Sequence, residues 1–101
     1  MIVIYIACKD EEEAKKISKA LLEKKMIACA NIFPVQSMFW WENKIEEKGE
    51  YIIIAKTIKT RFDEVSDIVK DLHSYDVPLI EQWDIDAVDK DYLDWLNKEV
   101  G

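Results

Sequence analysis

Glycine and proline are scarce in this sequence, with two of each among 101 residues. Because long irregular loops depend on these residues, we expect helices and strands to follow one another closely. Arg61 is the only arginine, and 21 acidic against 14 basic residues give a net charge of -7, which argues against a nucleic-acid partner. No apolar run approaches the roughly 18 residues of a membrane span, so a membrane partner is not expected either.

Cysteine and histidine are also few. Cys8 and Cys29 lie inside apolar runs, and two cysteines in a chain of this size do not form a disulfide framework. The first apolar run, Ile2 to Cys8, is followed by acidic residues rather than by a cleavage site, so we expect no signal peptide. These features predict a cytoplasmic protein. His73 is the only histidine, so a metal site with several imidazole ligands within one chain is excluded.

The residues that are abundant indicate one folded domain. The hydrophobic fraction of 50% and the aromatic fraction of 11% exclude disorder. A length of 101 residues suits a single domain covering residues 1–101. Nearly all basic residues are lysine, and glutamate and isoleucine are frequent, which is typical of a thermostable protein from a heat-tolerant source.

Hydrophobic spacing predicts the outline of the fold. Residues 2–8 are apolar at every position, as in a central strand that is buried on both faces. A helix over about 11–25 follows, with Asp10 as its cap and Glu13 at the capping-box position. Thr60 is the expected cap of a second helix. The later elements are expected over residues 60–73 (helix), 79–85 (strand) and 91–100 (helix).

The stretch from Ala28 to Trp41 predicts an unusually long strand. Pro34 cannot donate to a strand ladder, so this strand is expected at an edge of the sheet. Glu42 and Asn43 suit a two-residue turn, after which paired residue numbers should sum to about 85 until Gly49 allows a bulge. This register places Phe39 opposite Glu46 and Cys29 opposite Lys56.

The element order predicts an α+β fold, a ferredoxin-like βαββαβ sandwich with a long hairpin between its second and third strands and an extra C-terminal helix. Fourteen strand residues would reach about 46 Å, whereas a domain of this size has a diameter on the order of 33 Å. The hairpin should therefore project. Trp40 and Trp41 face opposite ways on such a strand, so its own core could bury only one of them, and a partner chain is expected to cover the other.

No catalytic set is apparent in the sequence, because no nucleophile, base and orienting group occur together. The protein is therefore not expected to be an enzyme. Lys56 lies inside an apolar strand and must either extend to solvent or find a carboxylate, so it marks a polar pocket or the point where the strand emerges. His73 has two interpretations, a hydrogen-bonded residue at a helix end or a metal ligand.

Several motifs resemble those of the CutA divalent-cation tolerance proteins, in order and over essentially the whole chain. Two departures are Asn43, where the family usually has glycine, and Ser74, where it usually has proline. Family cysteine ligands near the first strand do not align cleanly with Cys8, and only His73 carries over as a metal ligand by motif. The matching residues are Ala28-Cys29-Ala30-Asn31, Ser37, Phe39-Trp40-Trp41, Lys44, Glu50, Lys56-Thr57, His73, Tyr75, Pro78 and Asp91 to Leu96.

The resemblance implies a homotrimer, related in shape to the PII signalling proteins, in which long hairpins pair between subunits. It implies a role in tolerance or buffering of a divalent metal ion, with copper or another divalent ion as the ligand. The few ligand residues of the chain predict weak to moderate copper binding. The alternative is a PII-like regulator that binds a small molecule or a partner protein between subunits. In a trimer, the expected metal ligands are His73 with carboxylates or with Cys29, from the same or a neighbouring subunit. The expected interface is Phe39, Trp40 and Trp41, and the candidate ligand cleft is Asn31, Ser37, Glu50, Lys56, Thr57 and Tyr75.

Overall fold

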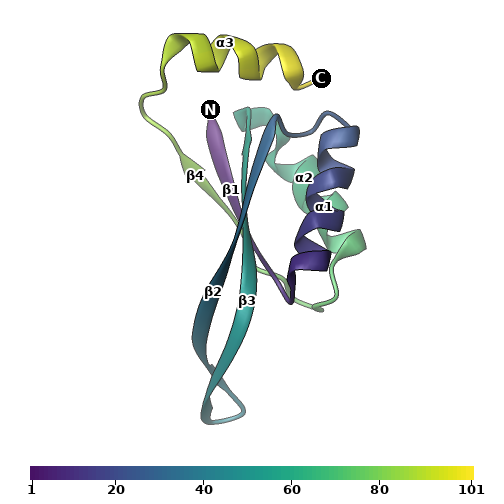
Figure 1. Ribbon diagram of the computed structural model, residues 1–101, viewed down its shortest axis with the longest axis vertical. Coiled ribbons are helices and arrows are strands. Elements are labelled where there is room, and N and C mark those ends of the chain that lie inside the picture. The colour runs from purple at the N-terminus through teal and green to yellow at the C-terminus, as the bar shows by residue number, and fades with distance from the viewer.

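A computed structural model describes residues 1–101, and its elements follow the predicted order (Figure 1). They are β1 (Ile2–Cys8), α1 (Glu11–Glu23), β2 (Cys29–Trp41), β3 (Lys44–Thr57), a short 3-10 turn at Lys59–Arg61, α2 (Phe62–Leu72), β4 (Ile80–Asp84) and α3 (Lys90–Glu99). The predicted βαββαβ sandwich with an extra C-terminal helix is confirmed. No helix is long and apolar enough to cross a membrane.

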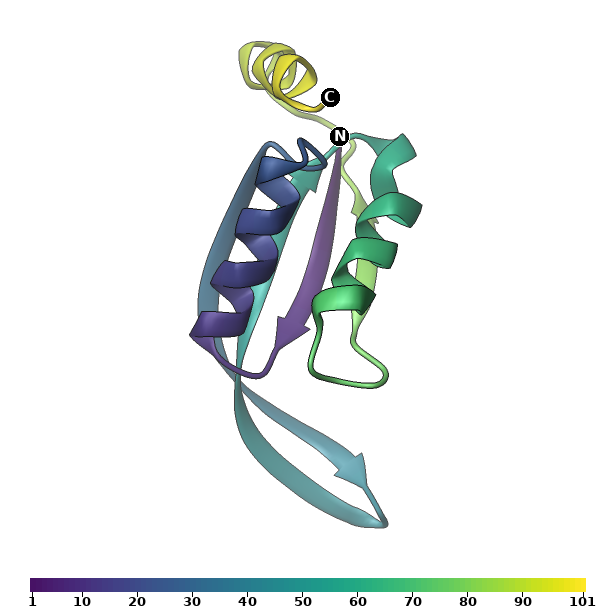
Figure 2. The same ribbon diagram turned by 90° about the vertical axis from the view of Figure 1, so that its right-hand side faces the viewer.

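The four strands form one antiparallel sheet in the order β2-β3-β1-β4. The apolar β1 is central, as predicted, and β2 with its Pro34 lies at an edge. Figure 2 shows α1 and α2 side by side on one face of the sheet, while α3 lies across the end near the N-terminus. The opposite face of the sheet carries no helix along most of its length.

The core fills the space between the sheet and the two helices. Alternation along β1 points every second side chain, from Ile2 to Cys8, toward α1 and α2. These meet side chains from the helices and from β3, such as Ile17, Val65 and Ile53, and all of them are buried. One chain therefore completes its own core on this face.

The hairpin of β2 and β3 has the predicted register. Phe39 pairs with Glu46, and Cys29 pairs with Lys56. Glu42 and Asn43 have φ values of 49° and 64°, the left-handed pair that a tight two-residue turn requires. The expected bulge at Gly49 is wrong: Gln36 pairs with Gly49 and the ladder continues without a break, because Gly49 adopts an ordinary strand conformation.

The two helix starts differ. Asp10 caps α1 as predicted, since its Oδ1 accepts a hydrogen bond of 2.8 Å from the amide of Glu13. The predicted cap at Thr60 is wrong, because the chain there forms the 3-10 turn and α2 begins at Phe62 without a side-chain cap. Across the first turn, the guanidinium of Arg61 donates to Glu64 over 2.8 Å.

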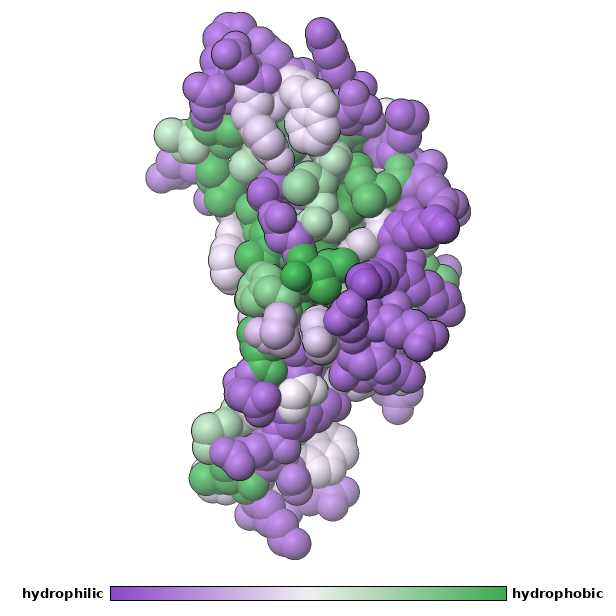
Figure 3. Space-filling view, viewed as in Figure 1, coloured by the Kyte–Doolittle hydropathy of each residue, from purple (hydrophilic) through white to green (hydrophobic).

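The hairpin projects from the body, as its length predicted. The molecule measures 46 Å along its longest axis and 26 and 21 Å across, and the hairpin forms its lower part (Figure 1). In Figure 3 the same end carries apolar residues, in green, between charged ones. Trp40 is 73% exposed and Trp41 is 61% exposed, so this chain buries neither of them.

Candidate functional site

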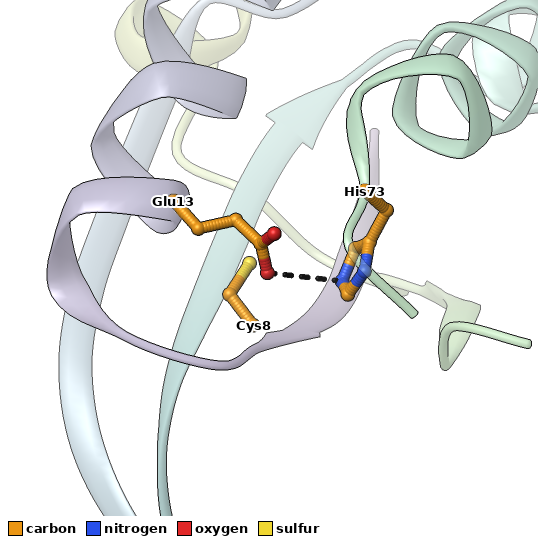
Figure 4. Close-up of side chains that lie close together, drawn as sticks. All are labelled: Cys8, Glu13 and His73. Carbon is orange, nitrogen blue, oxygen red and sulfur yellow. Dashed lines mark ion pairs between the residues drawn. The ribbon is translucent and has the colours of Figure 1, made fainter. Parts of the chain in front are cut away.

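Three element ends meet at one corner of the core. β1 ends at Cys8, whose side chain faces the helices, and α1 begins at Glu11, so that Glu13 lies in its first turn. α2 ends at Leu72, and His73 leaves the helix with an extended ψ of 142°. Figure 4 shows the side chains of Cys8, Glu13 and His73 pointing toward one another.

The three side chains offer one ligand-type atom each, and these atoms all lie within 4.8 Å of one another. His73 Nε2 lies 3.8 Å from Glu13 Oε1, the contact drawn as a dashed line in Figure 4. The thiol of Cys8 and the side chain of His73 are fully buried, and Glu13 is nearly so. A thiol, a carboxylate and an imidazole are thus gathered away from solvent.

Both ring nitrogens of His73 are already hydrogen-bonded. The amide of Tyr75 donates to Nδ1 over 3.0 Å, so Nδ1 carries no proton. Nε2 therefore carries the proton of the neutral ring and donates it to the carbonyl oxygen of Ala7 over 2.7 Å. The histidine ties the end of α2 to β1, which is the structural role that the sequence allowed.

Glu13 is held in a similar way. Its two carboxylate oxygens accept hydrogen bonds from the amides of Lys9, over 3.0 Å, and Ser74, over 2.9 Å. Burial raises the pKa of the Glu13 carboxyl, but the hydrogen bonds from Ser74 and Lys9 outweigh it and leave the pKa below the ordinary value. Glu13 therefore stays ionised at neutral pH.

The same surroundings shift the pKa of Cys8 upward, whereas they lower that of Glu13. Burial, followed by the negative charge of Glu13, raises the pKa of its thiol to about 12. A sulfur, nitrogen and oxygen donor set suits zinc or copper, so the cluster fits such an ion by donor type and spacing. Binding must remove the thiol proton and take a nitrogen of His73 from its hydrogen bond. The geometry therefore favours weak binding that depends on pH.

A second feature is a groove of about 840 Å³ between the hairpin and the turn that joins α2 to β4. Tyr75 from that turn donates its hydroxyl to Glu50 Oε2 of β3 over 2.8 Å. The ammonium of Lys48 lies 4.3 Å from the centre of the Tyr75 ring. Burial and the hydrogen bond to Glu50 raise the pKa of Tyr75, so its hydroxyl stays a donor.

The structure divides the six residues of the candidate ligand cleft between two places. Ser37, Glu50 and Tyr75 line the groove together. The other three lie toward the opposite end of the hairpin, where Lys56 is six residues from Glu50 along β3, or about 20 Å. The hydroxyl of Thr57 is buried and donates to the carbonyl of Met26 over 2.6 Å, which is a structural contact. Asn31 pairs with Ile54 in the ladder.

Cys29 and His73 do not meet within the chain. Cys29 pairs with Lys56 in the ladder, and the ammonium of Lys56 lies 5.8 Å from the centre of the Tyr92 ring on α3. Within one subunit the cysteine beside His73 is Cys8, which sequence reasoning missed. The available signal was Glu13, since its capping-box position directs its carboxylate toward the junction that follows Cys8. A site formed with Cys29 of a neighbouring subunit stays a prediction.

Comparison with known proteins gives one consistent result. The family model described as CutA1 divalent ion tolerance protein matches residues 2–99. The chain is 50% identical to the divalent-cation tolerance protein CutA of Archaeoglobus fulgidus over 97 residues, 96% of this chain and 95% of that one. It is 44% identical to the protein of the same name from Pyrococcus horikoshii over 99 residues, with 98% and 97% covered. A solved structure described as the periplasmic divalent cation tolerance protein CutA from Archaeoglobus fulgidus superposes with a TM-score of 0.97 at 48% identity, with all of both chains covered.

Proposed function

This chain belongs to the CutA1 divalent ion tolerance protein family, and we propose that it acts in divalent-cation tolerance by binding the ion, as a homotrimer and without catalysis. The observation that carries this proposal is the convergence of Cys8, Glu13 and His73 within 4.8 Å. No other group of three such side chains lies as close together in the molecule. The three residues offer a soft sulfur, an imidazole nitrogen and a carboxylate oxygen, which together suit copper or zinc.

Copper is the proposed ion, held weakly at roughly one ion per subunit. It stands above zinc in the usual affinity order of divalent metals, and a thiolate beside an imidazole favours it further. The hydrogen bonds of His73 and Glu13 must rearrange on binding, and the thiol of Cys8 must lose a proton whose pKa is about 12. These costs support a buffering role rather than permanent retention of the ion.

The absence of catalysis is part of the proposal. The thiol of Cys8 would be the strongest nucleophile of the cluster as a thiolate, but burial keeps it protonated at neutral pH. Nδ1 of His73 accepts from Tyr75, and Nε2 donates to Ala7, so neither nitrogen is free to take the thiol proton. A binding site is therefore the better-supported function.

The homotrimer is supported by the hairpin. Phe39, Trp40 and Trp41 at its tip are all exposed in the single chain, and we assign them to the subunit interface. The edge strands β2 and β4 each have one unpaired side, which a second copy of the chain can use. The free thiols of Cys8 and Cys29 support the cytoplasm as the compartment.

Calorimetric titration with Cu²⁺, and with Zn²⁺ as an ion that does not oxidise thiols, tests the metal site. We expect His73→Ala and Cys8→Ser each to weaken binding by at least about tenfold. Cys29→Ser is the matched control, because it removes the other free thiol without touching the cluster, and it should leave binding unchanged. Binding that survives both cluster variants would contradict the proposed site. Loss in Cys29→Ser and His73→Ala alone would move the site to two neighbouring subunits.

A second function is favoured by the groove between the hairpin and the α2–β4 turn, namely a PII-like regulator that binds a small molecule. The groove has the size of an ordinary ligand pocket, and it already orders Tyr75 against Glu50. Thermal unfolding with panels of metabolites and metal ions compares the two functions. A ligand at 100 times its dissociation constant adds about 2.7 kcal/mol to the free energy of unfolding, so stabilisation by an organic ligand alone would favour the regulator.

A further inference from the structure

We propose that the groove between the hairpin and the α2–β4 turn binds an organic cation, an ammonium group joined to an apolar body, with Tyr75 and Glu50 receiving the charged end. This inference rests on the second function above, the binding of a small molecule, and adds the chemical class of that molecule. It does not require a metal ion to be bound at the cluster of Cys8, Glu13 and His73.

The walls of the groove suit an amphipathic ligand. Its volume of about 840 Å³ lies within the range of small-molecule sites. Seven of its 13 lining residues are hydrophobic, and they come from β1, from β2 and from the turn between α2 and β4. The apolar residues include Ala7, Phe39, Trp41 and Leu79.

The charges around the groove select the sign of the ligand. Four acidic residues line it against one basic residue, Lys48, so the lining has an excess of negative charge. A ligand anion would therefore be repelled, whereas a cation would be attracted and would gain from the partly desolvated surroundings. The four carboxylates belong to Glu46, Glu47, Glu50 and Asp76.

Lys48 shows where a cation sits in this groove. Its ammonium lies 4.3 Å from the centre of the Tyr75 ring, a distance typical of a cation–π contact. The Tyr75 hydroxyl is fixed by Glu50 at 2.8 Å, so the ring has a carboxylate at its edge and a cation on its face. An ammonium ligand can take the place of the Lys48 side chain, which can swing out to solvent.

The turn that carries Tyr75 is fixed by two backbone hydrogen bonds. The backbone amide of Tyr75 donates to His73 Nδ1 over 3.0 Å, and the amide of the preceding residue, Ser74, donates to Glu13 over 2.9 Å. Both partners lie in the buried cluster, so the turn that carries Tyr75 is anchored to the core. A ring ordered before binding loses little freedom when the ligand arrives. The groove shares Phe39 and Trp41 with the aromatic surface assigned to the subunit interface, so binding has to be measured on the native assembly.

Three probes of similar size and different charge test the proposal: benzyltrimethylammonium, benzyl alcohol and benzenesulfonate. Each is titrated into the full-length protein in its native assembly, and affinity is taken from NMR chemical-shift changes. We expect benzyltrimethylammonium to bind most tightly and to shift the Tyr75 ring and the Ala7 methyl. Benzenesulfonate should bind least. The methyl groups of Val3, which lie outside the groove, serve as the internal control.

Two lysine variants make the test sharper. Lys48→Met removes the internal competitor and should strengthen binding of benzyltrimethylammonium by about two- to fivefold, the equivalent of one exposed cation–π contact. Lys44→Met removes the same charge from the same strand outside the groove, and it should change the affinity less than Lys48→Met. Glu50→Gln should weaken binding of the cation while leaving that of benzyl alcohol unchanged.

Each contrary outcome has a distinct meaning. If benzyl alcohol or benzenesulfonate binds as tightly as the cation, the ligand class is wrong although the groove still binds small molecules. If no probe shifts the groove residues, or if a second copy of the chain already covers Tyr75 in the native assembly, both this inference and the small-molecule function are overturned. Equal effects of Lys48→Met and Lys44→Met would also overturn it, because general charge would then explain the change.

Discussion

Ile53 and Ile45 lie eight residues apart in the same strand, yet Ile53 is fully buried and Ile45 is 60% exposed. Ile53 lies in the body of the domain, where α1 and α2 cover the sheet. Ile45 lies at the hairpin tip beyond the reach of either helix, paired with Trp40. The same residue type in the same strand therefore has two environments, decided by what packs over the strand. On the helix side the body buries its core within one chain, whereas the tip leaves large apolar side chains exposed, where we propose that a second copy of the chain packs.

The largest effect is expected from substitutions at the hairpin tip. Replacing both Trp40 and Trp41 by alanine should dissociate the proposed trimer or lower its melting temperature sharply. Each tryptophan can bury roughly 150 to 250 Å², which corresponds to about 4 to 6 kcal/mol as an upper bound. Sedimentation velocity gives the assembly state. Leu22→Ala, at an exposed apolar position on α1, is the control and should keep the wild-type assembly. A double variant that assembles like the wild type would remove these residues from the interface.

The body can be tested against the tip with two matched substitutions in β3. Ile53→Ala should lower the free energy of unfolding by about 2 to 5 kcal/mol, because it leaves a cavity in the core. Ile45→Ala should change the free energy of unfolding by less than about 1 kcal/mol, since an exposed side chain has few contacts to lose. Both substitutions are made in the variant that lacks Trp40 and Trp41, so that subunit contacts do not contribute. Denaturant titrations of both variants give the difference. Equal losses would mean that the tip is packed against its own chain.

Most of the features that distinguish the body from the hairpin tip could be predicted from the sequence. The strand alternation, the hairpin register, the tight turn and the Asp10 cap all depend on residues close to one another in the chain. The contact between His73 and β1 joins residues 66 positions apart, and it depends on where α2 ends against the sheet. Local spacing carries no signal for such a contact, so the sequence placed His73 in a site with Cys29 and missed Cys8. The unbroken ladder at Gly49 was missed for another reason, because glycine permits a bulge without requiring one.

Within the body, Glu13 should make stability depend on pH. Its pKa is lower in the folded than in the unfolded chain, so its stabilisation is complete above its ordinary pKa of 4.5 and is lost as the pH falls below that value toward the folded pKa. Glu13→Gln should cost about 1 to 3 kcal/mol at pH 7, because its amide group cannot accept from both Lys9 and Ser74. Denaturant unfolding at pH 7 and pH 3.5 should show that the difference in free energy of unfolding between wild type and variant is smaller at the lower pH. A constant gap would mean that the charge of Glu13 is not what stabilises this corner.

The smallest expected effect concerns the starts of the two helices that cover the body. Asp10→Ala should lower the free energy of unfolding by about 1 kcal/mol, because it removes the acceptor for the Glu13 amide. Thr60→Ala should have almost no effect, since the Thr60 side chain caps neither the 3-10 turn nor α2. Thermal and denaturant unfolding of the two variants in parallel measure the difference. A larger loss at Thr60 than at Asp10 would reverse the assignment of the caps.

Sedimentation equilibrium of the unmodified protein at micromolar concentration tests most directly the claim that the body is self-sufficient and the tip is not. The proposed assembly predicts a mass of three times 11.9 kDa that holds over a wide range of concentration. A stable, soluble monomer of 11.9 kDa with Trp40 and Trp41 exposed would contradict it.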